Sequence, residues 1–168
     1  MSRAPANLDP ANLDRVIVHH SASPADDTTP ETVRRWHIVD RQYEDVGYHF
    51  VIGADGGLHL GRPMWRIGAH DGGENATSLG ICALGDWRIG EDGVLPGALQ
   101  WETLVLLCAD LLDQLDLPTS ALRGHRENEP ASTPTLCPGF DPAVLRDAVA
   151  LERSSRRSRA PGLYPYTT

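Results

Sequence analysis

Lysine is absent from this chain, and all fifteen of its basic residues are arginine. This absence excludes mechanisms in which a lysine forms a Schiff base or acts as a general acid. Cysteine is scarce, because only Cys82, Cys108 and Cys137 occur among 168 residues. An odd and widely spaced set of cysteines argues against a disulfide framework. Cys82 and Cys108 lie in apolar segments that predict core packing, whereas Cys137 precedes a proline and a glycine in a loop.

Long hydrophobic runs are also missing, since none approaches the ~20 residues that a membrane-spanning helix needs. The opening residues, MSRAPANLDPANLDR, contain no apolar stretch, so we expect synthesis in the cytoplasm without a secretory signal and no membrane insertion. Acidic residues are in excess, and the formal net charge of −8 argues against nucleic acid as a partner. We expect a monomer that folds as one domain.

The composition divides the chain into three segments. Residues 1–13 are rich in proline, alanine, asparagine and aspartate and are expected to form an N-terminal arm, followed by a domain over residues 14–152. Residues 153–168 carry four arginines and no acid, and we predict a flexible, basic C-terminal tail. Its charge is expected to be solvated, with attraction to an anionic polymer surface as the alternative.

The hydrophobic pattern predicts strands and helices that mix without strict alternation. Strands are predicted at residues 15–19, 47–53, 58–62, 78–85 and 121–125. Helices are predicted within residues 28–41, 98–115 and 139–153, because Thr29 and Asp141 each supply a cap before a proline. These elements indicate an α/β fold with one mixed, mostly central sheet flanked by helices.

Helical spacing predicts which side chains of the two longer helical patterns face the core. In the first, these are Val33, Trp36 and Val39. In the second, they are Trp101, Leu104, Val105, Cys108, Leu111, Leu112 and Leu115.

Seven histidines are present, and most lie at predicted strand ends or in glycine-bounded loops. His37 and His59 are expected to be packing or exposed positions. The segment VIVHHSASP ends a strand at His19 and His20, and RGHRENEPASTPTLCPGF separates His125 from Cys137 by eleven residues. Two histidines and one cysteine with a fourth position open is the pattern of a catalytic zinc site. This spacing is no established code, and strand alternation alone does not choose between His19 and His20.

Several motifs occur in order and carry a more specific signal. They are VIVHHSAS, DVGYHFVIGADG, GRP, GAHDGGENATSLGICALGDW, LRGHRE and TLCPGFD. Together, over residues 14–150, they resemble the zinc-dependent type 2 N-acetylmuramoyl-L-alanine amidases, a family that includes phage amidases and peptidoglycan recognition proteins. The resemblance implies a single-domain zinc amidase fold, Zn²⁺ as cofactor and peptidoglycan as substrate.

The resemblance also implies roles for individual residues. His19, His125 and Cys137 match the metal ligands, and Tyr48 matches a tyrosine that orients water or polarises the scissile carbonyl. Thr135 stands where phage-type members often have lysine, so we expect it to stabilise an oxyanion less strongly than a cation does.

Other matched positions leave two interpretations open. His70 and Asn75 match a loop that lines the substrate groove, with hydrogen bonding inside the loop as the alternative. Glu127 either orients an imidazole or is an exposed acid. His20 and His49 are expected to be packing or supporting residues.

The resemblance implies hydrolysis of the amide bond between N-acetylmuramic acid and L-alanine, in a phage or prophage endolysin that reaches the cell wall after release. The alternatives are a peptidoglycan-binding module without catalysis and a cytoplasmic amidase that recycles muropeptides. Cys137 favours an enzyme, because loss of the cysteine ligand usually marks the binding modules.

Overall fold

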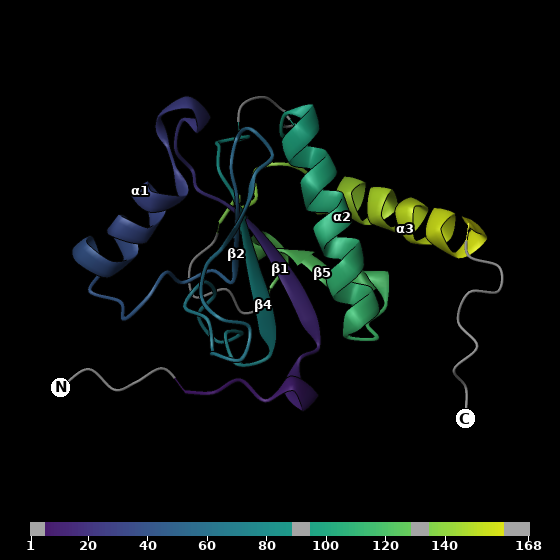
Figure 1. The fold of residues 1–168 in the computed structure, drawn as a ribbon, viewed down its shortest axis with the longest axis horizontal. Helices are drawn as coiled ribbons and strands as arrows, with labels where there is room; N and C mark the ends of the chain where they lie inside the picture. The colour runs from purple at the N-terminus through teal and green to yellow at the C-terminus, as the bar shows by residue number, and fades with distance from the viewer. Residues whose placement is uncertain (1–5, 89–94, 129–134, 160–168) are drawn as a thin grey trace.

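A computed structural model describes residues 6–88, 95–128 and 135–159 of the chain, and in it five strands form one mixed sheet (Figure 1). The strand order is β3-β2-β4-β1-β5. The strands are β1 (Arg15–His20), β2 (Phe50–Ile52), β3 (Leu58–Leu60), β4 (Ser78–Ala83) and β5 (Leu122–Gly124). Neighbouring strands are parallel except for β3, which pairs antiparallel with β2 at the edge. The predicted α/β class is confirmed.

Among the described residues, three α-helices flank the sheet: α1 (Pro30–Arg35), α2 (Ala98–Gln114) and α3 (Pro142–Arg159). Figure 1 shows α1 on one side of the strands and α2 with α3 on the other. The predicted caps are present, since Thr29 accepts a hydrogen bond from the backbone N–H of Thr32, and Asp141 accepts one from Ala143. None of the described helices combines the length and the apolar character that crossing a membrane requires.

The helix that begins at Pro30 changes its winding at Trp36, and residues Trp36–Asp40 form a π-helix. The prediction that Val39 faces the core is wrong, because Val39 is 63% exposed. The prediction assumed α-helical spacing throughout, whereas a π-helical turn hydrogen-bonds five residues apart and so rotates the following side chains. His37 takes the buried position in this turn.

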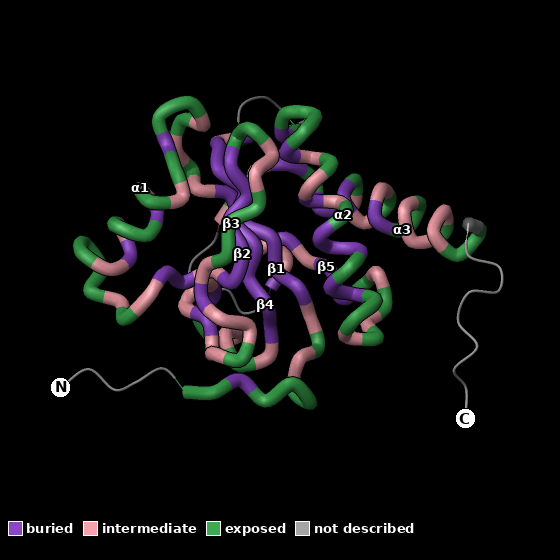
Figure 2. The backbone as a smooth tube through the Cα atoms, in the orientation of Figure 1, coloured by how far each residue is buried: buried purple, intermediate pink, exposed green. Residues whose placement is uncertain are grey.

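The core has two parts, one on each face of the sheet. Val16 and Val18 of β1 join the larger cluster, which includes Leu104 and Cys108 of α2 and Leu145 of α3. The smaller cluster lies on the α1 side and consists of Val33, Val46, Val51, Cys82 and Leu84. All six residues of β4 are buried, and the neighbouring strands β1 and β2 are buried almost throughout, whereas the edge strand β3 is exposed (Figure 2). Both faces of the sheet are therefore covered, as its hydrophobic run predicted.

The long helix α2 buries Leu104, Cys108, Leu111 and Leu112 as predicted. The remaining predicted positions are partly buried against the same cluster, namely Trp101, Val105 and Leu115. Cys108 is therefore a core thiol, which agrees with its predicted packing role.

Helix α3 continues to Arg159, beyond the predicted end of the helix at residue 153. Arg153 pairs with Asp113 of α2 at 2.7 Å, and Arg156 pairs with Asp110 of α2 and with Glu152. These two arginines thus tie α3 to α2, and the first part of the segment predicted to be a flexible tail is helical. Residues 160–168 lie outside the described part of the chain.

Parallel pairing brings the carboxyl ends of β1, β4 and β5 to one edge of the sheet. In the β1–β4 register, His19 lies opposite Cys82, and His125 follows β5 directly. Because ligand sites in α/β proteins form at the carboxyl ends of parallel strands, this edge is where a site is expected.

Candidate functional site

His19, His125 and Cys137 converge at this edge, and their potential ligand atoms all lie within 4.8 Å of one another. The Sγ atom of Cys137 lies 3.7 Å from Nδ1 of His19. The three residues come from β1, from the turn after β5 and from the loop before α3. Side chains that are distant in the sequence thus form one group that could hold a metal ion.

The pleat of β1 separates the two adjacent histidines. The ring of His19 lies beside that of His125, with a centroid distance of 4.6 Å. The ring of His20 lies against Trp87 instead, while its backbone N–H donates to Cys137 Sγ at 3.3 Å. His20 therefore supports the cysteine through its backbone and is absent from the group of ligands.

Burial shifts the pKa values of His19 and Cys137. Burial, and then the neighbouring His70 and His125, hold the pKa of His19 well below its usual value, so that its imidazole is neutral. Burial raises the pKa of the Cys137 thiol to about 12, although the N–H of His20 acts in the opposite direction. A thiolate here requires a nearby cation, and two histidines with one cysteine fit the donor set of catalytic zinc.

The three side chains open into a cavity of about 480 Å³. It is lined by His19, His20, Ser21, Ala22, Arg41, Tyr48, His70, Arg88, His125, Thr135, Leu136 and Cys137. The Tyr48 ring lies 5.2 Å from that of His19. Burial raises the pKa of Tyr48 well above its usual value, so its hydroxyl stays protonated and can donate a hydrogen bond. Thr135 Oγ1 accepts a hydrogen bond from the backbone N–H of Cys137 at 3.1 Å.

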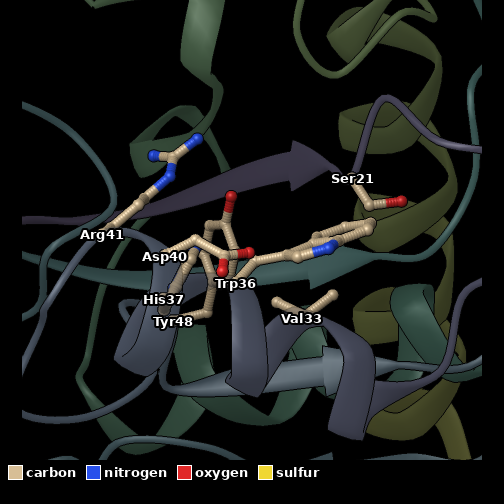
Figure 3. Close-up of a pocket in the computed structure, with 7 residues that line it drawn as sticks. All are labelled: Ser21, Val33, Trp36, His37, Asp40, Arg41 and Tyr48. Carbon is tan, nitrogen blue, oxygen red and sulfur yellow. The ribbon is translucent and has the colours of Figure 1, made fainter.

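A second cavity, of about 230 Å³, adjoins the first between α1 and the end of β1 (Figure 3). It is lined by Ser21, Val33, Trp36, His37, Asp40, Arg41 and Tyr48. Ser21, Arg41 and Tyr48 line both cavities. Figure 3 shows the guanidinium of Arg41 and the hydroxyl of Tyr48 projecting to the same side. Arg41 is exposed, and none of the described residues forms a hydrogen bond or an ion pair with its guanidinium.

A loop between β3 and β4 contacts both histidines of the group. His70 Nδ1 lies 3.1 Å from His19 Nε2, and Asp71 Oδ1 lies 3.4 Å from His125 Nε2. Asn75 is not among the described residues that line either of these cavities, and its Oδ1 accepts hydrogen bonds from the backbone N–H groups of His70 and Asp71. The contact of Asp71 with the metal group was not predicted from the sequence. An acidic residue directly after a histidine in a glycine-bounded loop is a pattern that could have indicated it.

The other candidate residues have structural surroundings. Glu127 accepts a hydrogen bond from the N–H of Gly124 and forms an ion pair with Arg146. Its carboxylate is therefore used in these two contacts, and neither of the two earlier interpretations describes it. His49 is buried between the Arg66 carbonyl, 2.9 Å from its Nε2, and the Gly80 N–H, which donates to its Nδ1. It therefore supports the loop, as expected.

Comparison with known families identifies the chain. The family model described as N-acetylmuramoyl-L-alanine amidase, Amidase_2, matches residues 9–140. The chain belongs to this family. The matched range includes all three residues of the candidate metal group, and the chain is accordingly an amide hydrolase of the N-acetylmuramoyl-L-alanine amidase class.

Relatives of this amidase occur in phages and in animals. The endolysin of Escherichia phage T7 is 33% identical over 134 residues, which cover 77% of this chain and 83% of the endolysin. An N-acetylmuramoyl-L-alanine amidase of Mus musculus is 32% identical over 76% of this chain and 24% of its own length.

Solved structures share the fold of the amidase. The Ph2119 endolysin from a Thermus scotoductus bacteriophage superposes with a TM-score of 0.72 at 26% identity, covering 89% of this chain and 92% of the endolysin. Drosophila PGRP-LB superposes with a TM-score of 0.65 at 30% identity, covering 99% and 91% of the two chains. The predicted family and fold are confirmed.

Proposed function

We propose that this amidase is a zinc enzyme that cleaves the bond between N-acetylmuramic acid and L-alanine in peptidoglycan, and that it acts as the endolysin of a phage or prophage. The observation that carries this proposal is the convergence of His19, His125 and Cys137 at the wall of a cavity. The endolysins of phages T7, T3 and KP32 align with about three quarters of the chain and support the lytic role.

The residues at the cavity divide into those that hold the metal and those that act on the substrate. His19, His125 and Cys137 would hold Zn²⁺, which when bound supplies an activated water and a Lewis acid for the carbonyl. Tyr48 remains protonated and donates a hydrogen bond to the carbonyl oxygen as negative charge develops on it. Thr135 lines the same cavity, and its hydroxyl adds a neutral, weaker donor.

The substrate lies across the two adjoining cavities, with the scissile amide next to Tyr48. Arg41 lines both cavities, and peptidoglycan stem peptides carry carboxylates. A guanidinium binds a carboxylate with two parallel hydrogen bonds, and Arg41 has no partner among the described residues to give up first. Arg41 therefore holds the peptide part of the substrate. By contrast, Arg88 already pairs with Asp86.

The proposal is tested by digesting purified sacculi with the protein and analysing its metal content. We expect one zinc per chain and release of new L-alanine amino termini without new reducing sugars. The variant His125→Ala is expected to lose both zinc and cleavage, because it removes one of three donors. His59→Ala is the matched control, since His59 is an exposed histidine on β3.

Three results contradict the proposal. Normal cleavage by the His125→Ala variant would show that the assignment of the metal ligands is wrong. Binding to sacculi without cleavage by the wild-type chain makes it a recognition module. Cleavage of soluble anhydromuropeptides but not of sacculi places the enzyme in muropeptide recycling.

A further inference from the structure

The loop of residues 70–75 contacts the metal group through two consecutive residues, His70 and Asp71. We propose that this loop fixes the tautomer and the orientation of both histidine ligands, and that Asn75 holds the backbone of the loop in the required conformation. The inference rests on the proposed function, because it takes His19 and His125 as ligands.

The first contact fixes His19. Its Nδ1 faces Cys137 Sγ, and its Nε2 lies 3.1 Å from His70 Nδ1. A neutral imidazole carries one proton, so a proton on Nε2 that is donated to His70 leaves the Nδ1 lone pair for the metal. His70 acts here as the acceptor that selects this tautomer.

The ring of His70 lies in close contact with the backbone of two glycines. A Cβ atom on Gly80 would lie 2.4 Å from Cδ2 of His70, and a Cβ atom on Gly68 would lie 2.5 Å from the same atom. Both distances are shorter than real Cβ contacts, so a side chain at either glycine would have to displace the ring of His70. The ring of His49 lies edge-on to it at 5.7 Å. The acceptor is thus packed against the backbone of Gly68 and Gly80 and against the ring of His49.

The second contact fixes His125. The Asp71 carboxylate is 3% exposed, with one oxygen 3.4 Å from His125 Nε2 and the other accepting a hydrogen bond from Asn128 Nδ2. A buried carboxylate that faces Nε2 favours a proton on that nitrogen and leaves Nδ1 for the metal. Both histidines are therefore prepared to bind through Nδ1.

Asn75 connects the two contacts. Its Oδ1 accepts hydrogen bonds from the N–H groups of His70 at 2.8 Å and of Asp71 at 3.0 Å. The loop then joins β4, where Ser78 Oγ donates to the Glu74 carbonyl. One amide oxygen thus sets the backbone from which both supporting side chains project, although Asn75 touches neither ligand.

The test compares zinc affinity, measured by competition with a chelator, among folded variants. Asn75→Ala is expected to weaken zinc binding about 10- to 100-fold, the usual effect of losing a supporting partner. Asn75→Asp keeps the Oδ1 acceptor and is expected to restore most of the affinity. Asp55→Asn is the control, since Asp55 accepts a hydrogen bond within the β2–β3 turn, away from the metal group.

A second variant keeps the test decisive if Asn75→Ala does not fold. Asp71→Asn replaces the carboxylate at His125 with an amide of the same size, and we expect weaker zinc binding and a changed absorption spectrum of the cobalt-substituted protein. Spectrum and affinity both unchanged in Asp71→Asn overturn the inference.

The outcomes separate this inference from the proposed function. If the wild type binds zinc and cleaves sacculi, and Asn75→Ala binds zinc equally tightly, the positioning role is overturned and the proposed function stands. Equal losses in Asn75→Ala and Asn75→Asp overturn the role of the shared acceptor. A wild-type chain that binds no zinc overturns the proposed function and this inference together.

Discussion

His37 provides a quantitative test of how burial affects the stability of this fold. It is 5% exposed, and its Nδ1 accepts a hydrogen bond from the backbone N–H of Gly47 at 2.7 Å. Burial, and then the charges of Arg41 and Arg62, lower its pKa from 6.5 to about 4. The folded protein therefore resists protonating this ring at a pH where the unfolded chain accepts the proton.

The sign and size of the effect follow from linkage. The contribution of neutral His37 is complete above pH 6.5 and is lost as the pH falls towards 4, because the unfolded state then binds the extra proton. A fall in pKa from 6.5 to about 4 corresponds to a loss of about 3 kcal/mol in the free energy of unfolding, at about 1.4 kcal/mol per pH unit. His37→Asn keeps an acceptor near Gly47 but cannot titrate.

The assay is urea unfolding of the metal-free protein at several pH values between 7.5 and 4. We expect His37→Asn to lose less stability than the wild type over this range, by up to about 3 kcal/mol. The other buried histidines titrate in both proteins and cancel in the comparison. His59→Asn, on the exposed strand β3, should leave the pH profile unchanged. Parallel profiles for His37→Asn and the wild type would refute the reasoning.

Three further predictions concern substrate binding, the last helix and the core. Arg41→Gln should raise KM about 10-fold or more for a muropeptide with free carboxylates, with little change in kcat, because a charged hydrogen bond is lost; an equal effect on an amidated muropeptide would contradict this. Arg156→Ala removes the ion pairs with Asp110 and Glu152, so it should lower the free energy of unfolding by about 0.5–1 kcal/mol. Hydrogen exchange of the backbone amides near the end of α3 should become faster. Unchanged exchange there would show that these ion pairs do not stabilise the end of the helix. Phe140→Ala should lower the free energy of unfolding, measured in urea, by about 3–5 kcal/mol, because Phe140 is 1% exposed and packs between Trp87 and Trp101. A decrease below about 1 kcal/mol would contradict its place in the core.

Much of the architecture could be predicted from local patterns. The β-branched run before His19, the continuous apolar run of β4 and the apolar stripe of α2 each follow from a local pattern. The bounds of these three elements lie within about two residues of the predicted ones. Val39 shows the limit of this approach, because a change from α- to π-helical winding alters spacing without an obvious compositional signal. The length of α3 depends on ion pairs with α2, which no local pattern contains.

The metal group was predictable only from several motifs taken together. Alternation in β1 shows that His19 and His20 face opposite ways, but it does not show which side holds the site. The supporting residues were harder still. The pairing of Asp71 with His125 joins a loop to a turn across 54 positions, and it exists only because parallel pairing places β4, β1 and β5 side by side.

The sheet divides the molecule into two compartments with different tasks. The larger apolar cluster, with α2 and α3, lies behind β1, whereas His19 projects from the opposite face towards Tyr48 and the smaller cluster. Substitutions that improve packing in the larger cluster can therefore raise thermal stability. The sheet separates those positions from the face that carries His19. Amidase activity and stability become two properties that can be optimised separately.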